Sequence, residues 1–247
     1  MDRRALAPSK PSLVERVLMR CPGQCAVCRA WSSQRVCPDC LMRYARPVPR
    51  CWTCAARLPP ELIGRREPKC GACLRHAPPL ARCIAALDYA FPWDQLLQRY
   101  KFHQALDLRE TLLERLDQAL DVAEAEAPDW LLPVPLSRER LRERGYNQSH
   151  ELARALAKRR RLASEPALLL RVRDTEHQLR LPPEQRSANV RRAFAVEPRR
   201  AQALRGSHVA LLDDVMTTGA TLFELARVLQ QAGVVQVQAW VVARTSD

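Results

Sequence analysis

The chain has 247 residues, of which 47% are hydrophobic, which is enough for a real core in one large domain or two smaller ones. Its formal net charge of +13 suggests an anionic partner such as nucleic acid. Apolar runs stay short of membrane-spanning length, and Glu15, Arg16 and Arg20 interrupt the N-terminal segment. We therefore expect a cytoplasmic protein without membrane insertion or a signal peptide.

Cysteines dominate the stretch from residue 21 to residue 80. Eight of the ten cysteines form Cys-x-x-Cys pairs, namely Cys25/Cys28, Cys37/Cys40, Cys51/Cys54 and Cys70/Cys73. Without a secretory signal, such pairs are typical of metal-binding knuckles rather than disulfides. Two pairs supply the four thiolates that Zn²⁺ prefers in a tetrahedral site. We expect two structural zinc ions in a double zinc ribbon at 21–80, which would fold this region rather than perform chemistry.

Sequential pairing of the knuckles would give two consecutive ribbons and is favoured; a cross-braced arrangement would interleave them. A redox role is a weaker alternative, because four tandem pairs have no use in a thioredoxin-like site. Cys21 and Cys83 remain, and we expect small buried or idle thiols. Trp31 and Trp52 are expected to pack inside the ribbons, with stacking on nucleic-acid bases as the alternative.

The positive charge is concentrated before residue 80. Residues 1–80 hold 15 Lys and Arg against 5 Asp and Glu, and residues 81–247 hold 25 against 22. Two zinc ions with eight thiolates would reduce the excess of +10 in the first part to about +6. The remaining charge predicts contact with the backbone of single-stranded DNA, while a solvated surface is the alternative for many of these arginines.

After residue 80 the pattern becomes that of an α/β unit, which we place at 81–247. Strands are expected at 83–91, 130–135, 168–172, 209–212 and 234–243, and helices at 94–126 with a break near His103, at 150–162 and from 219 to near 233. The segment 173–194 is polar and contains prolines, so we expect a functional connection such as a lid. His177 in this segment is expected to be solvated rather than catalytic.

A basic segment follows the predicted strand at 130–135, where ligands bind in parallel sheets. Arg138 and Arg140 are well placed to hold a pyrophosphate group through paired hydrogen bonds. For Arg142 and Arg144, pyrophosphate binding and ordinary helical pairing with glutamates have equal weight.

The stretch after the strand at 209–212 carries the clearest chemistry. Asp213 and Asp214 suit the hydroxyl groups of a ribose, directly or through Mg²⁺. Thr217, Thr218 and Thr221 supply hydroxyl donors, and Gly219 lets the backbone approach a ligand closely. The start of the following helix favours an anion. Helix capping alone would explain some of these residues, although it does not require two acids and three threonines.

This stretch closely resembles the phosphoribosyl pyrophosphate (PRPP) signature of type I phosphoribosyltransferases. By that resemblance the PRPP site comprises Asp213, Asp214, Val215, Met216, Thr217, Thr218, Gly219, Ala220 and Thr221. The acidic pair would hold the ribose during catalysis, residues 217–221 would hold the 5-phosphate, and Arg138 and Arg140 would hold the pyrophosphate with Mg²⁺.

The chain as a whole resembles the ComF family. The resemblance rests on the four cysteine pairs, the PRPP signature, and the motifs at 133–135, 144–148 and 173–194. It implies a type I phosphoribosyltransferase fold, a mainly parallel sheet flanked by helices, preceded by a double zinc ribbon. It also implies a role in natural transformation or DNA utilisation, with PRPP, single-stranded DNA and DNA-uptake proteins as partners. Two functions stay open: a PRPP-binding accessory protein, or an active phosphoribosyltransferase of nucleotide metabolism with an unknown acceptor.

Overall fold

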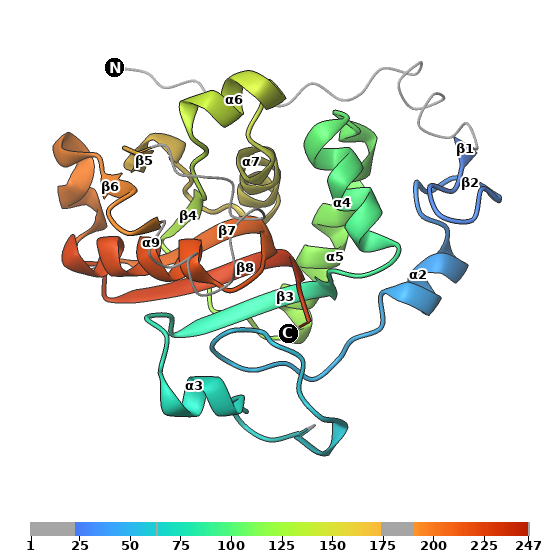
Figure 1. Ribbon diagram of the computed structural model, residues 1–247, viewed down its shortest axis with the longest axis horizontal. Coiled ribbons are helices and arrows are strands. Elements are labelled where there is room, and N and C mark those ends of the chain that lie inside the picture. Colours follow the sequence, from blue (N-terminus) through green and yellow to red (C-terminus); the bar gives the residue numbers. More distant parts are fainter. Residues whose placement is uncertain (1–22, 63, 174–189, 247) are drawn as a thin grey trace.

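The computed structural model describes residues 23–62, 64–173 and 190–246, and its centre is a four-stranded parallel sheet (Figure 1). The strands lie in the order β3-β8-β7-β4 and are all parallel. Their bounds are β3 Arg82–Asp88, β4 Trp130–Pro133, β7 His208–Met216 and β8 Gln236–Arg244. This is the parallel α/β architecture that the sequence predicts.

The helices that connect these strands follow the expected pattern. They are α4 Trp93–Phe102, α5 Arg109–Val122, α6 Arg138–Arg144, α7 Gln148–Arg160 and α9 Ala220–Gln231. The predicted break near His103 is confirmed, because α4 ends there and the short 3₁₀ turn η2 Leu106–Leu108 leads into α5. Further 3₁₀ turns are η1 Pro60–Leu62, η3 Pro166–Leu168 and η5 Pro198–Leu204.

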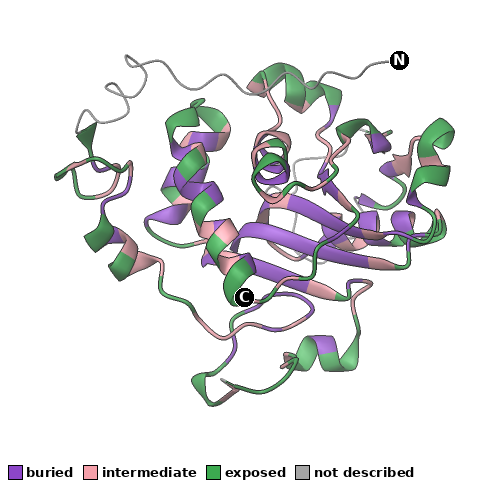
Figure 2. Cartoon of the chain, turned by 180° about the vertical axis from the view of Figure 1, so that it is seen from behind, coloured by how far each residue is buried: buried purple, intermediate pink, exposed green. Residues whose placement is uncertain are grey.

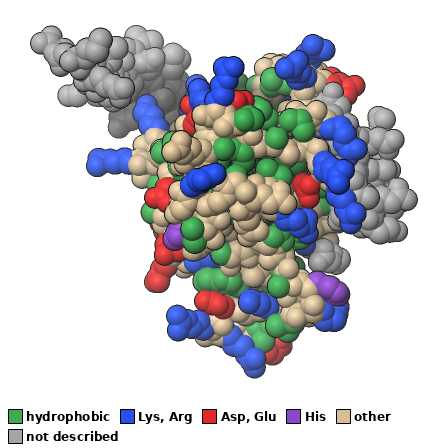
Figure 3. All heavy atoms as spheres, turned by 90° about the vertical axis from the view of Figure 1, so that its left-hand side faces the viewer, with side chains coloured by type: hydrophobic (Ala, Val, Ile, Leu, Met, Phe, Trp, Pro, Cys, Tyr) green, Lys and Arg blue, Asp and Glu red, His purple; other side chains and the backbone are tan. Residues whose placement is uncertain are grey.

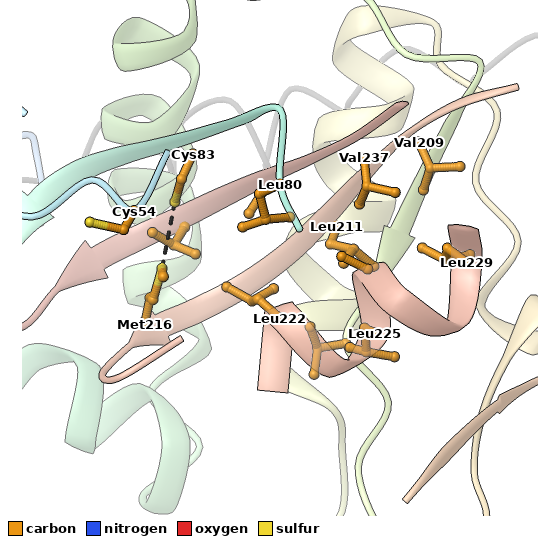
Figure 4. Packing of buried hydrophobic residues seen from close by; sticks show 14 of the residues in the cluster. Cys54, Leu80, Cys83, Val209, Leu211, Met216, Leu222, Leu225, Leu229 and Val237 are labelled. Atoms are coloured by element: carbon orange, nitrogen blue, oxygen red, sulfur yellow. Dashed lines mark hydrogen bonds between the residues drawn. The ribbon is translucent and has the colours of Figure 1, made fainter. Parts of the chain in front are cut away.

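The sheet has a hydrophobic core on each face because side chains alternate along its strands. On one face Val209 and Leu211 of β7 pack with Leu222, Leu225 and other apolar residues of α9 (Figure 4). On the other face Ala210, Leu212 and neighbouring residues pack with α4, α5 and α7. The strands of the sheet are accordingly mostly buried, whereas the helices have one buried and one exposed side (Figure 2).

The predicted strand at 168–172 exists as β5 Leu169–Arg171, but it lies outside the main sheet. It forms an antiparallel pair with β6 Phe194–Val196, which the sequence did not predict. The residues between these two strands include most of the predicted lid and His177. Residues 174–189, which include His177, lie outside the described residues, as does Cys21.

The cysteine-rich region contains little regular structure: β1 Gly23–Gln24, β2 Trp31–Ser32, α2 Pro38–Tyr44 and α3 Gly71–Arg75. It is joined to the sheet by hydrogen bonds to two carbonyls of one knuckle. The amide of Cys83 donates to the Trp52 carbonyl at 2.8 Å, and Arg244 Nε donates to the Cys54 carbonyl at 3.0 Å. The expected packing of Trp31 is wrong, because its side chain lies on a two-residue strand and is 73% exposed.

Candidate functional site

The structure groups the eight paired thiols into two clusters, and in each the four sulfur atoms lie within 4.8 Å of one another. The clusters are Cys25, Cys28, Cys37, Cys40 and Cys51, Cys54, Cys70, Cys73. This confirms the sequential grouping and excludes the cross-braced one. Sulfur atoms from neighbouring pairs lie 3.6 Å apart in the first cluster and 3.7 Å apart in the second. Four sulfurs at about 2.3 Å from a zinc ion would be about 3.8 Å apart, so both clusters fit this metal.

Backbone amides point at the sulfur atoms that begin each cluster. Val27 and Cys37 donate to Cys25 Sγ at 3.4 and 3.3 Å, and Cys70 donates to Cys51 Sγ at 3.3 Å. The hydrogen bond with Cys54, supported by the Cys70 amide, lowers the pKa of the Cys51 thiol against the opposing effect of burial. Such bonds stabilise a thiolate, which is the form that binds metal.

Cys83 is buried as expected and lies outside both clusters. Its thiol donates to Met216 Sδ at 3.5 Å, and burial raises its pKa to about 12 (Figure 4). A thiol with a raised pKa is unreactive, which agrees with a packing role.

The acidic pair lies within β7 rather than beyond its end. The sequence placed both carboxylates where the strand emerges, but β7 continues to Met216, because its pairing with β8 extends to Met216 opposite Arg244. The neighbouring strand β4 ends earlier, at Pro133 opposite Leu212. The acids therefore sit just past the carboxyl end of β4, which is where ligands bind in such sheets.

Asp213 is held by hydrogen bonds from α7 and from its own strand. Ser149 Oγ donates to Asp213 Oδ1 at 2.9 Å, and the amide of Asp214 donates to the same oxygen at 2.9 Å. Burial and the Asp214 carboxylate raise the pKa of Asp213 to about 7, against the lowering effects of Lys101 and Ser149. This carboxyl group can exchange a proton near neutral pH.

Asp214 is 2% exposed and pairs with a lysine that the sequence analysis missed. Lys101 Nζ, from the end of α4, lies 2.8 Å from Asp214 Oδ2. The other oxygen, Oδ1, accepts a hydrogen bond from the Val215 amide at 2.7 Å. The lysine compensates part of the negative charge of the two carboxylates. Its sequence context, Tyr100-Lys101-Phe102 in an amphipathic helix, gave no signal of this role.

The predicted loop and the start of helix α9 come directly after the end of β7 in the chain. Gly219 precedes α9 with a φ of +82°, a left-handed conformation that favours glycine. A Cβ atom at this position would lie 2.5 Å from Met216 Cε and 2.6 Å from Phe223 Cζ. Thr218 Oγ1 accepts a hydrogen bond from the Ala220 amide at 3.4 Å. The loop therefore requires glycine for its backbone conformation and for the space beside it.

One cavity of about 170 Å³ brings most of these groups together. Its walls include Asp213, Asp214, Thr217 and Thr221 of the predicted PRPP site. Other lining residues come from the segments after β3 and β4 and from α4, α6, α7 and β5: Tyr89, Gln98, Lys101, Phe102, Val134, Pro135, Leu136, Arg140, Arg144, Gln148 and Arg171.

The arginines of the basic segment differ in position. Arg140 and Arg144 line the cavity, whereas Arg138 is exposed and is not among its lining residues. Arg144 also stacks on the Phe102 ring at 4.8 Å and donates to Gln148 Oε1 at 3.2 Å. The cavity residues that the sequence analysis did not assign, such as Lys101, Phe102 and Arg171, come from elements far apart in the chain.

The motif at 145–148 has a local structural explanation. Gly145 ends α6 with a φ of +77°, and Asn147 caps α7 by accepting hydrogen bonds from the amides of Ser149 and His150. Asn147 Nδ2 also donates to the Val134 carbonyl at 3.0 Å. The motif therefore fixes Ser149, the partner of Asp213, against the segment that follows β4.

Comparison with known proteins finds relatives that match most of the chain. It is 32% identical over 235 residues to the DNA utilization protein YhgH of Salmonella typhi, covering 92% of this chain and all of the relative. It is 30% identical over 213 residues to competence protein F of Haemophilus influenzae, covering 85% and 90%. The chain belongs to the ComF/YhgH family. Competence protein ComFC of Bacillus subtilis, a further member, is 25% identical over 225 residues, covering 85% and 89%.

No family model matches the chain. Among solved structures, the allosteric regulatory enzyme of purine biosynthesis is similar with a TM-score of 0.36 and 22% identity, covering 54% of this chain and 25% of that one. Within the described residues, the helices of this ComF/YhgH family member are too short or too polar to span a bilayer.

Proposed function

We propose that this protein binds PRPP with Mg²⁺ in the cavity beside the acidic pair and acts in DNA uptake or DNA utilisation. The main support is the convergence of Asp213 and Asp214 with Thr217, Thr221 and Arg140 in one cavity past the carboxyl end of β4. Carboxylates for ribose hydroxyls or Mg²⁺, hydroxyl donors for a phosphate and a cation for a pyrophosphate are the groups that PRPP requires. The names of the relatives support the link to DNA.

We assign the parts of PRPP to different sides of the cavity. Asp213 and Asp214 hold the ribose hydroxyls and Mg²⁺, and the loop at 217–221 with the start of α9 holds the 5-phosphate. Arg140, together with Arg144, faces the pyrophosphate. Arg138 contributes only to the surrounding positive charge, because it is exposed outside the cavity wall.

We further propose that each four-cysteine cluster holds one structural Zn²⁺, and that the chain is organised as a double zinc ribbon at 21–80 and a phosphoribosyltransferase-type domain at 81–247. The sulfur spacings and the amide donors support metal binding. Binding of Zn²⁺ to the eight cysteines as thiolates releases their protons, and the binding free energy helps to fold a region with few aliphatic side chains.

An active phosphoribosyltransferase is the second candidate function. The observation in its favour is that the cavity lining also includes Tyr89, Phe102 and Arg171, whose flat side chains suit stacking on an acceptor base. Displacement of pyrophosphate requires stabilisation of charge and orientation of the reactants more than a covalent nucleophile from the protein.

PRPP binding is tested by thermal unfolding with and without PRPP and Mg²⁺. A ligand at a hundredfold excess over its Kd stabilises the native state by about 2.7 kcal/mol, which gives an easily measured shift. The double variant Asp213→Asn with Asp214→Asn should lose this shift, whereas Asp39→Asn, on the ribbon helix α2, should keep it. No shift of the native protein at millimolar PRPP would refute binding.

Catalysis is tested separately by incubating the protein with PRPP, Mg²⁺ and a panel of nucleobases or single-stranded DNA, and following pyrophosphate release. Turnover that Asp213→Asn removes would establish the enzyme. PRPP binding without turnover across the panel would favour the accessory role.

A further inference from the structure

A second cavity, remote from the acidic pair, is an open groove of about 450 Å³. It lies between segment 41–52, which joins the two cysteine clusters, the edge strand β3 and the second half of α5. Its walls include the apolar side chains of Met42, Val48 and Val122, of which Met42 and Val122 are 67% and 70% exposed. Its lining shares no residue with the cavity at the acidic pair.

The floor of the groove is the outer edge of the sheet. Within the described sheet β3 pairs only with β8, and the consecutive residues 83–87 of β3 all line the groove. At the beginning of this edge the Cys83 amide donates to the Trp52 carbonyl at 2.8 Å, so the edge already holds one passing stretch of chain. Beyond that contact, no other described backbone group hydrogen-bonds to the outer edge of residues 84–87, which line the groove as buried or half-buried residues. An unpaired edge is a template for a further extended segment.

The groove is also positively charged. Its lining contains Arg46, Arg50, Arg82 and Arg115 but neither aspartate nor glutamate. Arg50 pairs with Asp88 at 2.8 Å, and Arg82 stacks on the Trp52 ring at 3.8 Å. Arg46 is exposed and donates from Nε to the Met42 carbonyl at 3.1 Å, and the half-buried Arg115 donates from Nη1 to Gln118 Oε1 at 2.9 Å. Neither arginine is ion-paired with an acid among the described residues, so both guanidinium groups can take acidic groups from an occupant.

We propose that this groove binds an extended, acidic segment of a partner protein, which adds a strand to the outer edge of β3. Backbone hydrogen bonds to the edge would supply affinity, and apolar side chains of the segment would lie against Met42 and Val122. Its acidic side chains would face Arg46 and Arg115. The chemistry favours a peptide over nucleic acid, because an oligonucleotide lacks the amide ladder that an edge strand pairs with.

The test uses the full-length, zinc-loaded protein and a short fluorescein-labelled peptide of alternating valine and aspartate, with anisotropy as the readout. The variants Met42→Glu and Val122→Glu place a negative charge on exposed groove positions, and we expect each to weaken binding about tenfold or more. Val235→Glu is the matched control, because Val235 is 67% exposed and lies outside the groove. It should bind the peptide like the native protein.

Three further arms complete the experiment. A valine–lysine peptide and a version of the first peptide with methylated backbone amides should both bind much more weakly, because they lack the charge or the strand hydrogen bonds. Amide NMR shifts on peptide addition should centre on residues 83–87. The proposal is overturned if the first peptide does not bind at millimolar concentration, if the lysine peptide binds equally well, or if Val235→Glu weakens binding as much as Val122→Glu. Binding of an oligothymidylate that Val122→Glu abolishes, without peptide binding, would instead identify a nucleic-acid groove.

Discussion

The ammonium group of Lys101 lies 2.8 Å from Asp214 Oδ2, and this pair links the end of α4 to the centre of the proposed PRPP site. Asp214 is 2% exposed, so its carboxylate has little contact with water and depends on protein groups for stabilisation. Lys101 itself is partly exposed at 19% of its side chain. The arrangement places a counter-charge beside Asp214 and leaves a cation at the wall of the cavity.

Replacing Lys101 by Met should therefore lower the free energy of unfolding, because the buried carboxylate of Asp214 would lose its counter-charge. Since Lys101 is partly exposed and water screens the pair, we expect a loss of about 1–3 kcal/mol. Adding Asp214→Asn to this variant should restore part of the loss. Urea unfolding provides the measurement, and Lys158→Met, at an exposed position on α7, is the control. An unchanged stability of Lys101→Met would mean that the pair contributes nothing to the fold.

The raised pKa of Asp213 predicts a pH-dependent stability. The folded protein holds this proton up to about pH 7, whereas an unfolded aspartate loses it near pH 4. The folded state therefore binds more protons between these limits, and the contribution of Asp213 to stability is full below about pH 4 and declines as the pH rises to about 7. Asp213→Asn should remove this decline, so the variant gains stability relative to the native protein as pH rises. Chemical unfolding across this range checks the trend, and a constant difference would contradict it.

Gly219→Ala should destabilise the loop for two reasons that a control separates. The new Cβ would lie 2.5 Å from Met216 Cε, and the loop would hold the alanine at a φ of +82°, which L residues rarely adopt. Gly206 has a φ of +72° with open space around its Cβ position, so Gly206→Ala measures the conformational cost alone, about 1–2 kcal/mol. We expect Gly219→Ala to cost more than this in thermal unfolding and also to weaken PRPP binding. Equal effects of the two substitutions would mean that Met216 and Phe223 yield without cost.

The second cysteine cluster should stabilise the sheet as well as itself. Carbonyls of Trp52 and Cys54 accept hydrogen bonds from Cys83 and Arg244, and this knuckle packs in the same core as β7 and α9. Purified protein should contain about two zinc ions per chain, and Cys70→Ser should lose one of them. Hydrogen exchange should then accelerate at amides of β3 and β8. Unaltered protection of these strands would show that the ribbon folds independently of the sheet.

Affinity for single-stranded DNA should fall steeply with salt if the cysteine-rich region follows a phosphate backbone. Of the arginines there, Arg35 and Arg57 already pair with Asp107 and Asp88. Figure 3 shows Lys and Arg side chains in several groups on one face, with acidic side chains among them.

The exposed Arg29, Arg65 and Arg66 are therefore the better positions to test, and replacing them with Ala should reduce the salt slope by about one unit per lost contact. The ion-paired Arg57→Ala should change the slope less, and PRPP binding should be unaltered in all of these variants. Undetectable binding of DNA at low salt would argue that the positive charge only keeps the surface hydrated or that it binds a protein partner.

The sequence by itself determined the local parts of this protein. Cysteine spacing predicted both four-sulfur clusters, because ligands within a knuckle are fixed by a few residues of chain. Apolar runs predicted the parallel strands, and the Asp213 to Thr221 pattern predicted a strand, loop and helix in the order found. These features depend on residues close together in the chain.

Only the tertiary structure decided which distant residues meet. Lys101 reaches Asp214, and Ser149 reaches Asp213, because α4 and α7 pack on the same face of the sheet. Neither residue has a distinctive sequence neighbourhood, so periodicity alone would assign each to an ordinary helix. The order β3-β8-β7-β4 also left β3 at the edge and created its arginine-lined groove. Strand order depends on long-range packing of apolar faces, which a pattern of neighbouring residues does not encode.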